Sequence, residues 1–117
     1  MKTLSVSILV NNVASRSGNF SSLQKQLDTI VVGTKPMVIL TEIFREACET
    51  SGLIINVTAQ SSHSTHLVAS EGDLNLPYLS VYEATNEFGN SFSRSIREYM
   101  KQNRENIQVV TVKPGAV

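Results

Sequence analysis

Short apolar runs alternate with longer segments of helical period along this chain, and this alternation constrains its fold more than any other feature. Aliphatic and β-branched residues are nearly continuous over residues 4–10, 53–57 and 107–112, as in strands buried on both faces of a parallel sheet. Between these runs, apolar residues recur every three to four positions, which is typical of helices with one buried face. The order strand, helix, strand, helix, strand predicts an α/β fold with three parallel strands joined by right-handed crossover helices.

The first helical segment contains two residues that disfavour a continuous helix. Gly33 and Pro36 interrupt its apolar pattern, and because proline is tolerated in a first helical turn, Pro36 is predicted to restart the helix. Ser51 and Gly52 are predicted to close it. The second helix is predicted over residues 80–102, after a polar, serine-rich loop. Each helix has an apolar face to bury, formed in the first by Leu23, Leu27, Ile30 and Val31 and in the second by Phe88, Phe92, Ile96 and Tyr99.

Length and charge narrow the classes of function. A chain of 117 residues is one small domain or a piece of a larger one. Its ten basic and ten acidic residues give no net charge, and therefore no electrostatic case for nucleic acid or an anionic membrane surface. No run approaches the ~20 apolar residues of a membrane span. We expect a cytoplasmic protein. We also expect it to self-associate, because with no net charge there is little electrostatic repulsion between its copies.

The single cysteine and the N-terminal residues carry no further function in this interpretation. Cys48 has no second cysteine with which to form an internal disulfide, and its apolar helical surroundings predict a buried structural thiol. The short apolar run near Met1 continues into Asn11 and Asn12, which favours a strand over a signal peptide.

Four short segments, in order and at nearly matching spacing, resemble the motifs of the short-chain dehydrogenase/reductase family. They are I-L-V-N-N-V-A (8–14), I-I-N-V-T-A (54–59), Y-E-A-T-N-E-F (82–88) and V-K-P-G-A-V (112–117). The corresponding family segments read N-N-A-G, I-x-N-x-S-S, Y-S-A-T-K-A-F and V-x-P-G-x-V. The variants at the first and third segments lean toward the branch of hydroxysteroid dehydrogenases and long-chain 3-ketoacyl-CoA reductases.

The resemblance implies a partial Rossmann-like fold over residues 1–117, from the equivalent of the family's fourth strand to the segment after its sixth. It also implies an NAD(P)-dependent oxidoreductase. Family members bind the pyrophosphate on a glycine-rich turn after the first strand, and no G-x-x-x-G-x-G occurs among these residues. We therefore expect the dinucleotide-binding half to be lacking and no cofactor to bind. What the resemblance leaves for cofactor contact is Asn11, Asn12, Pro114 and Gly115.

The family's catalytic residues are mostly replaced. In the family a tyrosine acts as acid or base, and a lysine four residues later stabilises the phenolate; free tyrosine has a pKa near ~10. Tyr82 keeps the first position, whereas Asn86 occupies the second. Ala59 occupies the serine position, with Thr58, Ser61 and Ser62 as nearby hydroxyls that could replace it. Gly33 falls near the position of the fourth residue, an asparagine.

The serine-rich loop adds two histidines and two carboxylates, His63, His66, Glu71 and Asp73. We expect no metal site there, because two histidines three residues apart in a polar loop are usually solvated.

The leading hypothesis is a non-catalytic relative of the family whose activity is association with itself or with an intact family member, through the two helices that pair between family subunits. The first alternative is an NAD(P)-dependent oxidoreductase acting on a steroid or 3-ketoacyl-type carbonyl or alcohol, if the missing halves are supplied. The second is a small binding module built around the long loop.

Overall fold

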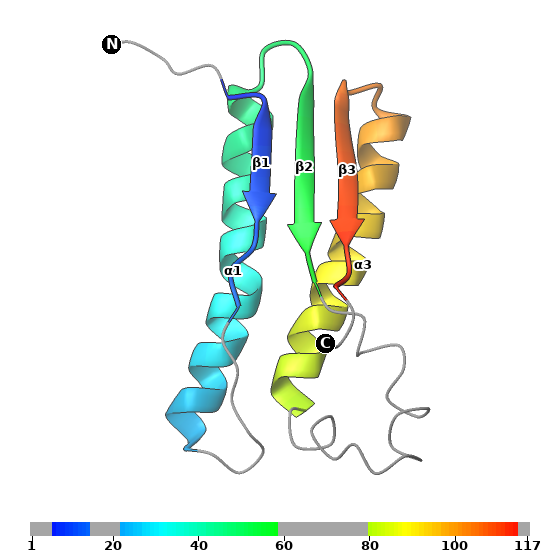
Figure 1. Cartoon of the computed structure of the whole chain (residues 1–117). Coiled ribbons are helices and arrows are strands. Elements are labelled where there is room, and N and C mark those ends of the chain that lie inside the picture. Colours follow the sequence, from blue (N-terminus) through cyan, green and yellow to red (C-terminus); the bar gives the residue numbers. More distant parts are fainter. Residues whose placement is uncertain (1–5, 15–21, 59–79, 115–117) are drawn as a thin grey trace, which may run out of the picture.

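The computed structural model of the chain describes residues 6–14, 22–58 and 80–114. Three strands, β1 (Ile8–Asn11), β2 (Gly52–Val57) and β3 (Ile107–Val112), form one sheet in the order β1-β2-β3. Both neighbouring pairs are parallel. Helix α1 (Leu23–Ala47) connects the first two strands, and α3 (Ser80–Gln102) precedes the third (Figure 1). The predicted α/β fold with a three-stranded parallel sheet is therefore confirmed.

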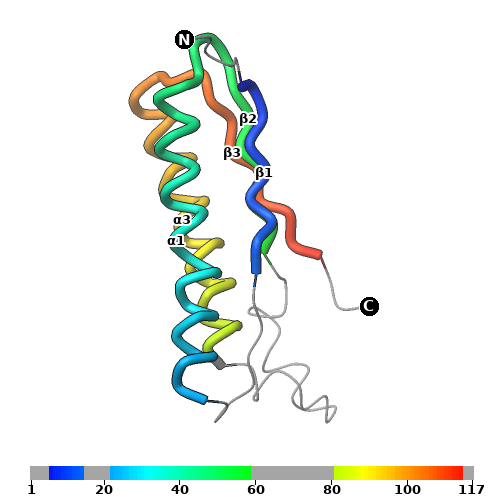
Figure 2. Tube along the Cα trace, turned by 90° about the vertical axis from the view of Figure 1, so that its left-hand side faces the viewer, coloured from blue at the N-terminus to red at the C-terminus, as the bar shows by residue number. Residues whose placement is uncertain are grey.

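Both helices cover the same face of the sheet (Figure 2). Because side chains alternate along a strand, every second residue points toward them, and Ile54 and Val109 meet Phe44 of α1 and Met100 of α3 in the buried apolar core. The other face carries aliphatic side chains in register across the strands. Its rows are Ile8, Leu53 and Gln108, then Val10, Ile55 and Val110, and finally Val57 and Val112. No described helix covers these rows.

Helix α1 corrects two expectations. It runs unbroken through Gly33 and Pro36 for 25 residues, whereas a restart at Pro36 was expected. Proline removes one N–H, the one that would reach the Val32 carbonyl, but the hydrogen bonds on either side keep the helix together. The helix also ends earlier than predicted, because the Cys48 N–H bonds the Phe44 carbonyl and Gly52 already belongs to β2. Its start is fixed by Ser22, whose hydroxyl accepts the Lys25 N–H at 3.3 Å.

The apolar face predicted for the first half of α1 is not buried. Leu23, Leu27, Ile30 and Val31 are all exposed, because α1 buries a different set of side chains: Thr29, Met37, Thr41 and Phe44. None of the helices in the described ranges is long and apolar enough to cross a membrane.

Two glycines allow α3 to pack closely against its neighbours. A Cβ on Gly33 would lie 2.7 Å from the Thr85 Cβ, and one on Gly89 would lie 2.8 Å from Thr58 Cγ2. The first contact joins the two helices, and the second seats α3 on the residue that follows β2. Since the Thr85 Cβ is bonded directly to the backbone, it cannot rotate away.

We expect Gly33→Ala to lower the free energy of unfolding by roughly 1–3 kcal/mol, because overpacking at this contact outweighs the better helix propensity of alanine. Urea unfolding followed by circular dichroism measures the change. Lys35→Ala, at an exposed site on the same helix, is the control and should change the value by no more than about 0.5 kcal/mol. Equal stability of both variants would show that the helices do not touch at Gly33.

Candidate functional site

The sequence-predicted catalytic positions gather where β2 ends and α3 begins. Thr58 directly follows β2, and Tyr82 and Asn86 occupy the first two turns of α3. Ligands of open α/β sheets bind in the crevice outside the carboxyl ends of the strands. This end of the sheet is therefore the candidate site.

Tyr82 and Asn86 are one helical turn apart, so their side chains lie on one face of α3. Tyr82 is half-buried. Asn86, at the position of the family's lysine, is only 7% exposed, and its Nδ2 has no hydrogen-bond partner among the described residues. Asparagine carries no charge, so this pair lacks the cation that would favour a phenolate.

Thr58 is one of the hydroxyls that could stand in for the serine. Its side chain is buried, and its Oγ1 donates to Asn90 Oδ1 at 2.6 Å. The hydroxyl proton is thus directed at α3. The serine position itself, Ala59, and the other two candidate hydroxyls, Ser61 and Ser62, lie outside the described residues.

Gly33, near the asparagine position, faces α3. It packs against Thr85, which directly precedes Asn86, so positions 33 and 86 lie at the same level of two neighbouring helices. No side chain larger than hydrogen fits at Gly33 while Thr85 keeps its place. The structure therefore brings Tyr82, Asn86 and Gly33 together at one end of the sheet, where Gly33 makes a packing contact and Asn86 is a buried neutral amide.

A chain of buried hydrogen bonds crosses from the sheet to α3. Asn11 Nδ2 donates to Asn56 Oδ1 at 2.8 Å, Asn56 Nδ2 donates to Ser93 Oγ at 2.8 Å, and Ser93 Oγ donates to the Gly89 carbonyl at 2.7 Å. Asn11 therefore bonds a side chain 45 residues away. Asn56 is fully buried, as its place in a strand predicted.

The other residues predicted to contact a cofactor do not take part in this series of hydrogen bonds. Asn12 and Pro114 are exposed, and Gly115 lies outside the described residues. The loop residues His63, His66, Glu71 and Asp73 lie outside them as well. Within the described ranges, no group of three or more histidine, cysteine, aspartate or glutamate side chains is placed to hold a metal ion.

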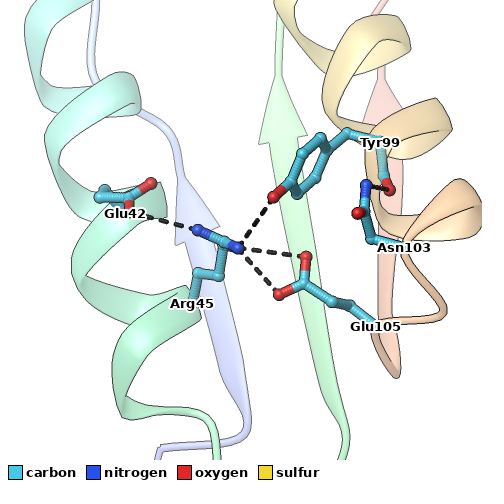
Figure 3. A network of polar contacts seen from close by, with 5 residues as sticks. All are labelled: Glu42, Arg45, Tyr99, Asn103 and Glu105. Atoms are coloured by element: carbon cyan, nitrogen blue, oxygen red, sulfur yellow. Dashed lines mark hydrogen bonds and ion pairs between the residues drawn. The ribbon is translucent and has the colours of Figure 1, made fainter.

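A second polar cluster, at the opposite end of the helices, was not anticipated (Figure 3). Arg45 Nε donates to both carboxylate oxygens of Glu105, at 2.9 and 3.1 Å, and its Nη2 donates to the Tyr99 hydroxyl at 3.0 Å. The guanidinium carbon also lies 5.1 Å from the centre of the Tyr99 ring. The hydrogen bond to Glu105 raises the pKa of Arg45 above its ordinary value. This cluster ties the end of α1 to the turn before β3.

Arg104 prepares that turn. Its φ of 54° lies in the left-handed region that favours glycine. The backbone N–H of Glu105 then bonds the Met100 carbonyl, which closes α3 and sets the Glu105 carboxylate toward Arg45. The cluster is therefore a structural clamp that is remote from the carboxyl ends of the strands.

A shallow hollow of about 300 Å³ lies at the amino ends of the strands, between residues such as Ile8, Gly52 and Gln108. None of its lining residues is titratable, and ligands of parallel sheets bind at the other end. It carries no chemistry.

Asn90 and Ser93 were not among the predicted site residues, because the aromatic residues of α3 form its more prominent periodic pattern. The signal was present: Asn86, Asn90 and Ser93 recur at spacings of four and three residues, which places three small polar side chains on one helix face.

We expect Ser93→Ala to lower the free energy of unfolding by about 1–3 kcal/mol, because it leaves the buried Asn56 Nδ2 without its acceptor. Ser95→Ala removes a hydroxyl from an exposed site on the same helix and serves as the matched control, since both variants gain the same helix propensity. Chemical denaturation of the two variants gives the difference. A Ser93→Ala variant as stable as Ser95→Ala would contradict the assigned role of the hydrogen-bond chain.

No family model matches this chain, and no curated protein matches it. Solved structures do. A short chain dehydrogenase/reductase from Burkholderia phymatum, in complex with NAD, superposes with a TM-score of 0.78 at 14% identity; the match covers 97% of this chain and 39% of that one. Acetoin dehydrogenase from Enterobacter cloacae gives 0.74 at 21% identity, over 96% and 43% of the two chains.

A bulky-bulky ketone specific alcohol dehydrogenase from Comamonas testosteroni gives a TM-score of 0.73 at 24% identity, covering 94% of this chain and 42% of that one. At these identities the likeness establishes the fold, and this chain spans about two-fifths of each matched structure. The branch of hydroxysteroid dehydrogenases and ketoacyl reductases stays a prediction. The family resemblance found in the sequence is confirmed at the level of structure: this chain has the short-chain dehydrogenase/reductase fold, over about two-fifths of the length of the matched structures.

Proposed function

We propose that this chain is a non-catalytic, cytoplasmic protein of short-chain dehydrogenase/reductase fold that acts by association, with a second copy of itself or with an intact relative. The observation that carries the proposal is the outward face of α1 and α3, which is apolar and uncovered by any described residue. We also propose that residues 1–117 form a partial domain of this fold.

The described residues do not fit NAD(P). The lysine position is occupied by the neutral, buried Asn86, and the 117 residues contain no glycine-rich turn for the pyrophosphate. At the tyrosine site, an amide cannot stabilise a phenolate as an ammonium group does. We therefore derive no hydride transfer at this site, and Tyr82 is a remnant that packs against its neighbours.

The association face consists of two stripes. On α1, Leu27, Val31 and Val38 are 45%, 44% and 41% exposed and share one side of the helix, since they are spaced by four and seven residues. On α3, Phe88 and Phe92 stack with ring centres 5.8 Å apart.

The Arg45–Tyr99 contact shows that these stripes are neighbours. Arg45 follows Val38 by seven residues and Tyr99 follows Phe92 by seven, so each lies on the same side of its helix as the stripe, and the two side chains bond each other. We name the set Leu27, Val31, Val38, Phe88 and Phe92 the helical face.

The size of the helical face suits a dimer. At 1.5 Å per residue, helices of 25 and 23 residues are about 35 Å long, and two helices side by side are about 20 Å wide, which gives roughly 700 Å². A stable interface buries ~800 Å² on each partner. The three short strands span about 20 by 15 Å by the same reasoning, too little alone. Pairing of two helical faces forms a four-helix arrangement.

We expect sedimentation velocity over a dilution series to show a dimer or larger oligomer at micromolar concentration, and Val38→Glu to weaken it at least tenfold, because a carboxylate would be buried in the apolar interface. Val110→Glu is the matched control: Val110 is 44% exposed but lies on the uncovered sheet face. A monomeric native chain would contradict the proposal, and loss of assembly in Val110→Glu alone would place the interface on the sheet.

One observation favours the alternative function, an NAD(P)-dependent oxidoreductase acting on a steroid or 3-ketoacyl-type substrate. The uncovered sheet face is apolar in seven of its eight side chains, from Ile8 to Val112, as its register shows. Parallel sheets are covered on both faces. A separate polypeptide that covered this face and supplied a dinucleotide-binding half would also bring cofactor contacts.

A further inference from the structure

One atom of the buried hydrogen-bond chain has no partner among the described residues. Asn11 is 5% exposed, and its Nδ2 donates to Asn56, but its Oδ1 is buried without a donor. Leaving a buried amide oxygen unpaired costs about 1–3 kcal/mol. This acceptor therefore calls for a donor from outside the described residues.

The Asn11 side chain lines a small cavity between the end of β1 and the middle of α1. The cavity has a volume of about 10 Å³ and is lined by Asn11, Val13, Val32, Gly33, Pro36 and Met37. That volume is about the least that holds one water molecule. Every lining side chain except that of Asn11 is apolar, so any further polar partner must come from the backbone.

Pro36 provides that partner. It lies inside α1 and has no N–H, so the carbonyl of Val32, four residues earlier, lacks its ordinary helical donor. Val32 and Pro36 both line the cavity. The cavity thus brings together two oxygen acceptors, while the donor of its one polar side chain, Asn11 Nδ2, is already bonded to Asn56.

We propose that this cavity binds a single structural water, which donates one hydrogen to Asn11 Oδ1 and the other to the Val32 carbonyl. Water has two donors, which matches the two acceptors. A cation is disfavoured, because no lining residue carries a carboxylate to balance its charge.

The water also extends the series of hydrogen bonds in the same donor-to-acceptor direction. Its hydrogen is donated to Asn11, Asn11 donates to Asn56, Asn56 donates to Ser93, and Ser93 donates to the Gly89 carbonyl. Hydrogen bonds that run one way polarise one another and strengthen the series. The water would therefore connect α1, β1, β2 and α3, and the proline in α1 creates its place.

Nuclear Overhauser contacts between water and the protein test the site. In the native chain, the Asn11 side-chain amide and the Met37 methyl group should show cross-peaks to water with the sign of a long-lived bound molecule. Pro36→Ala supplies an N–H to the Val32 carbonyl and removes one of the two partners, so these cross-peaks should disappear or change sign. Lys35→Ala, an exposed neighbour, should leave them unchanged.

A crystal structure of the native chain gives a second readout that does not depend on a variant. It should show one density peak about 2.7–3.2 Å from both oxygens. An empty cavity, a reversed Asn11 amide with Nδ2 facing the cavity, or native cross-peaks with the sign of surface water would each overturn the proposal. So would cross-peaks of unchanged strength in a folded Pro36→Ala variant.

Discussion

The bond between Asn11 and Asn56 is the constraint on which the rest of the structure depends. It joins β1 to β2 at the 2.8 Å separation of their side-chain amides, and Asn56 passes the constraint to α3 through Ser93. A buried amide is stable only if its partners stay in place, so this chain fixes how far α3 sits from the sheet. The apolar core of Phe44, Ile54, Met100 and Val109 supplies burial, whereas the amides determine the position of the helix.

The close contact of α1 and α3 follows from the position of α3, and it places a packing contact within the candidate site. Gly33 lets α1 approach Thr85, and Asn86, the next residue, is buried with an unpaired Nδ2. The sequence resemblance matches this glycine and this neutral amide to positions that hold polar catalytic groups in the family. A neutral amide cannot stabilise a phenolate as an ammonium group does, and this supports our proposal that the chain acts by association.

Much of the architecture could be predicted because hydrophobic period is a local signal. The strand at 107–112 and the helix at 80–102 were placed at their observed bounds, and the parallel order was confirmed. The unbroken α1 could not be predicted, because the local pattern does not show whether the helical hydrogen bonds on either side of Pro36 outweigh the one that proline removes. The predicted burial of Leu23 and Leu27 was wrong for a related reason: both are exposed, because an apolar stripe shows that a helix has an apolar side, but not whether the sheet extends beneath it. Arg45 and Glu105, 60 residues apart, have no local signature, and the predicted roles of Tyr82 and Asn86 stay predictions.

The central claim, that this fold is kept without cofactor chemistry, is tested most directly by titrating the purified chain with NADPH and following nicotinamide fluorescence, with an intact short-chain dehydrogenase as the positive control. The account predicts no change in emission beyond that of free NADPH at any protein concentration, because Asn86 is neutral and the 117 residues hold no pyrophosphate-binding turn. A saturable rise or blue shift in the NADPH emission that excess NADP reverses would contradict it.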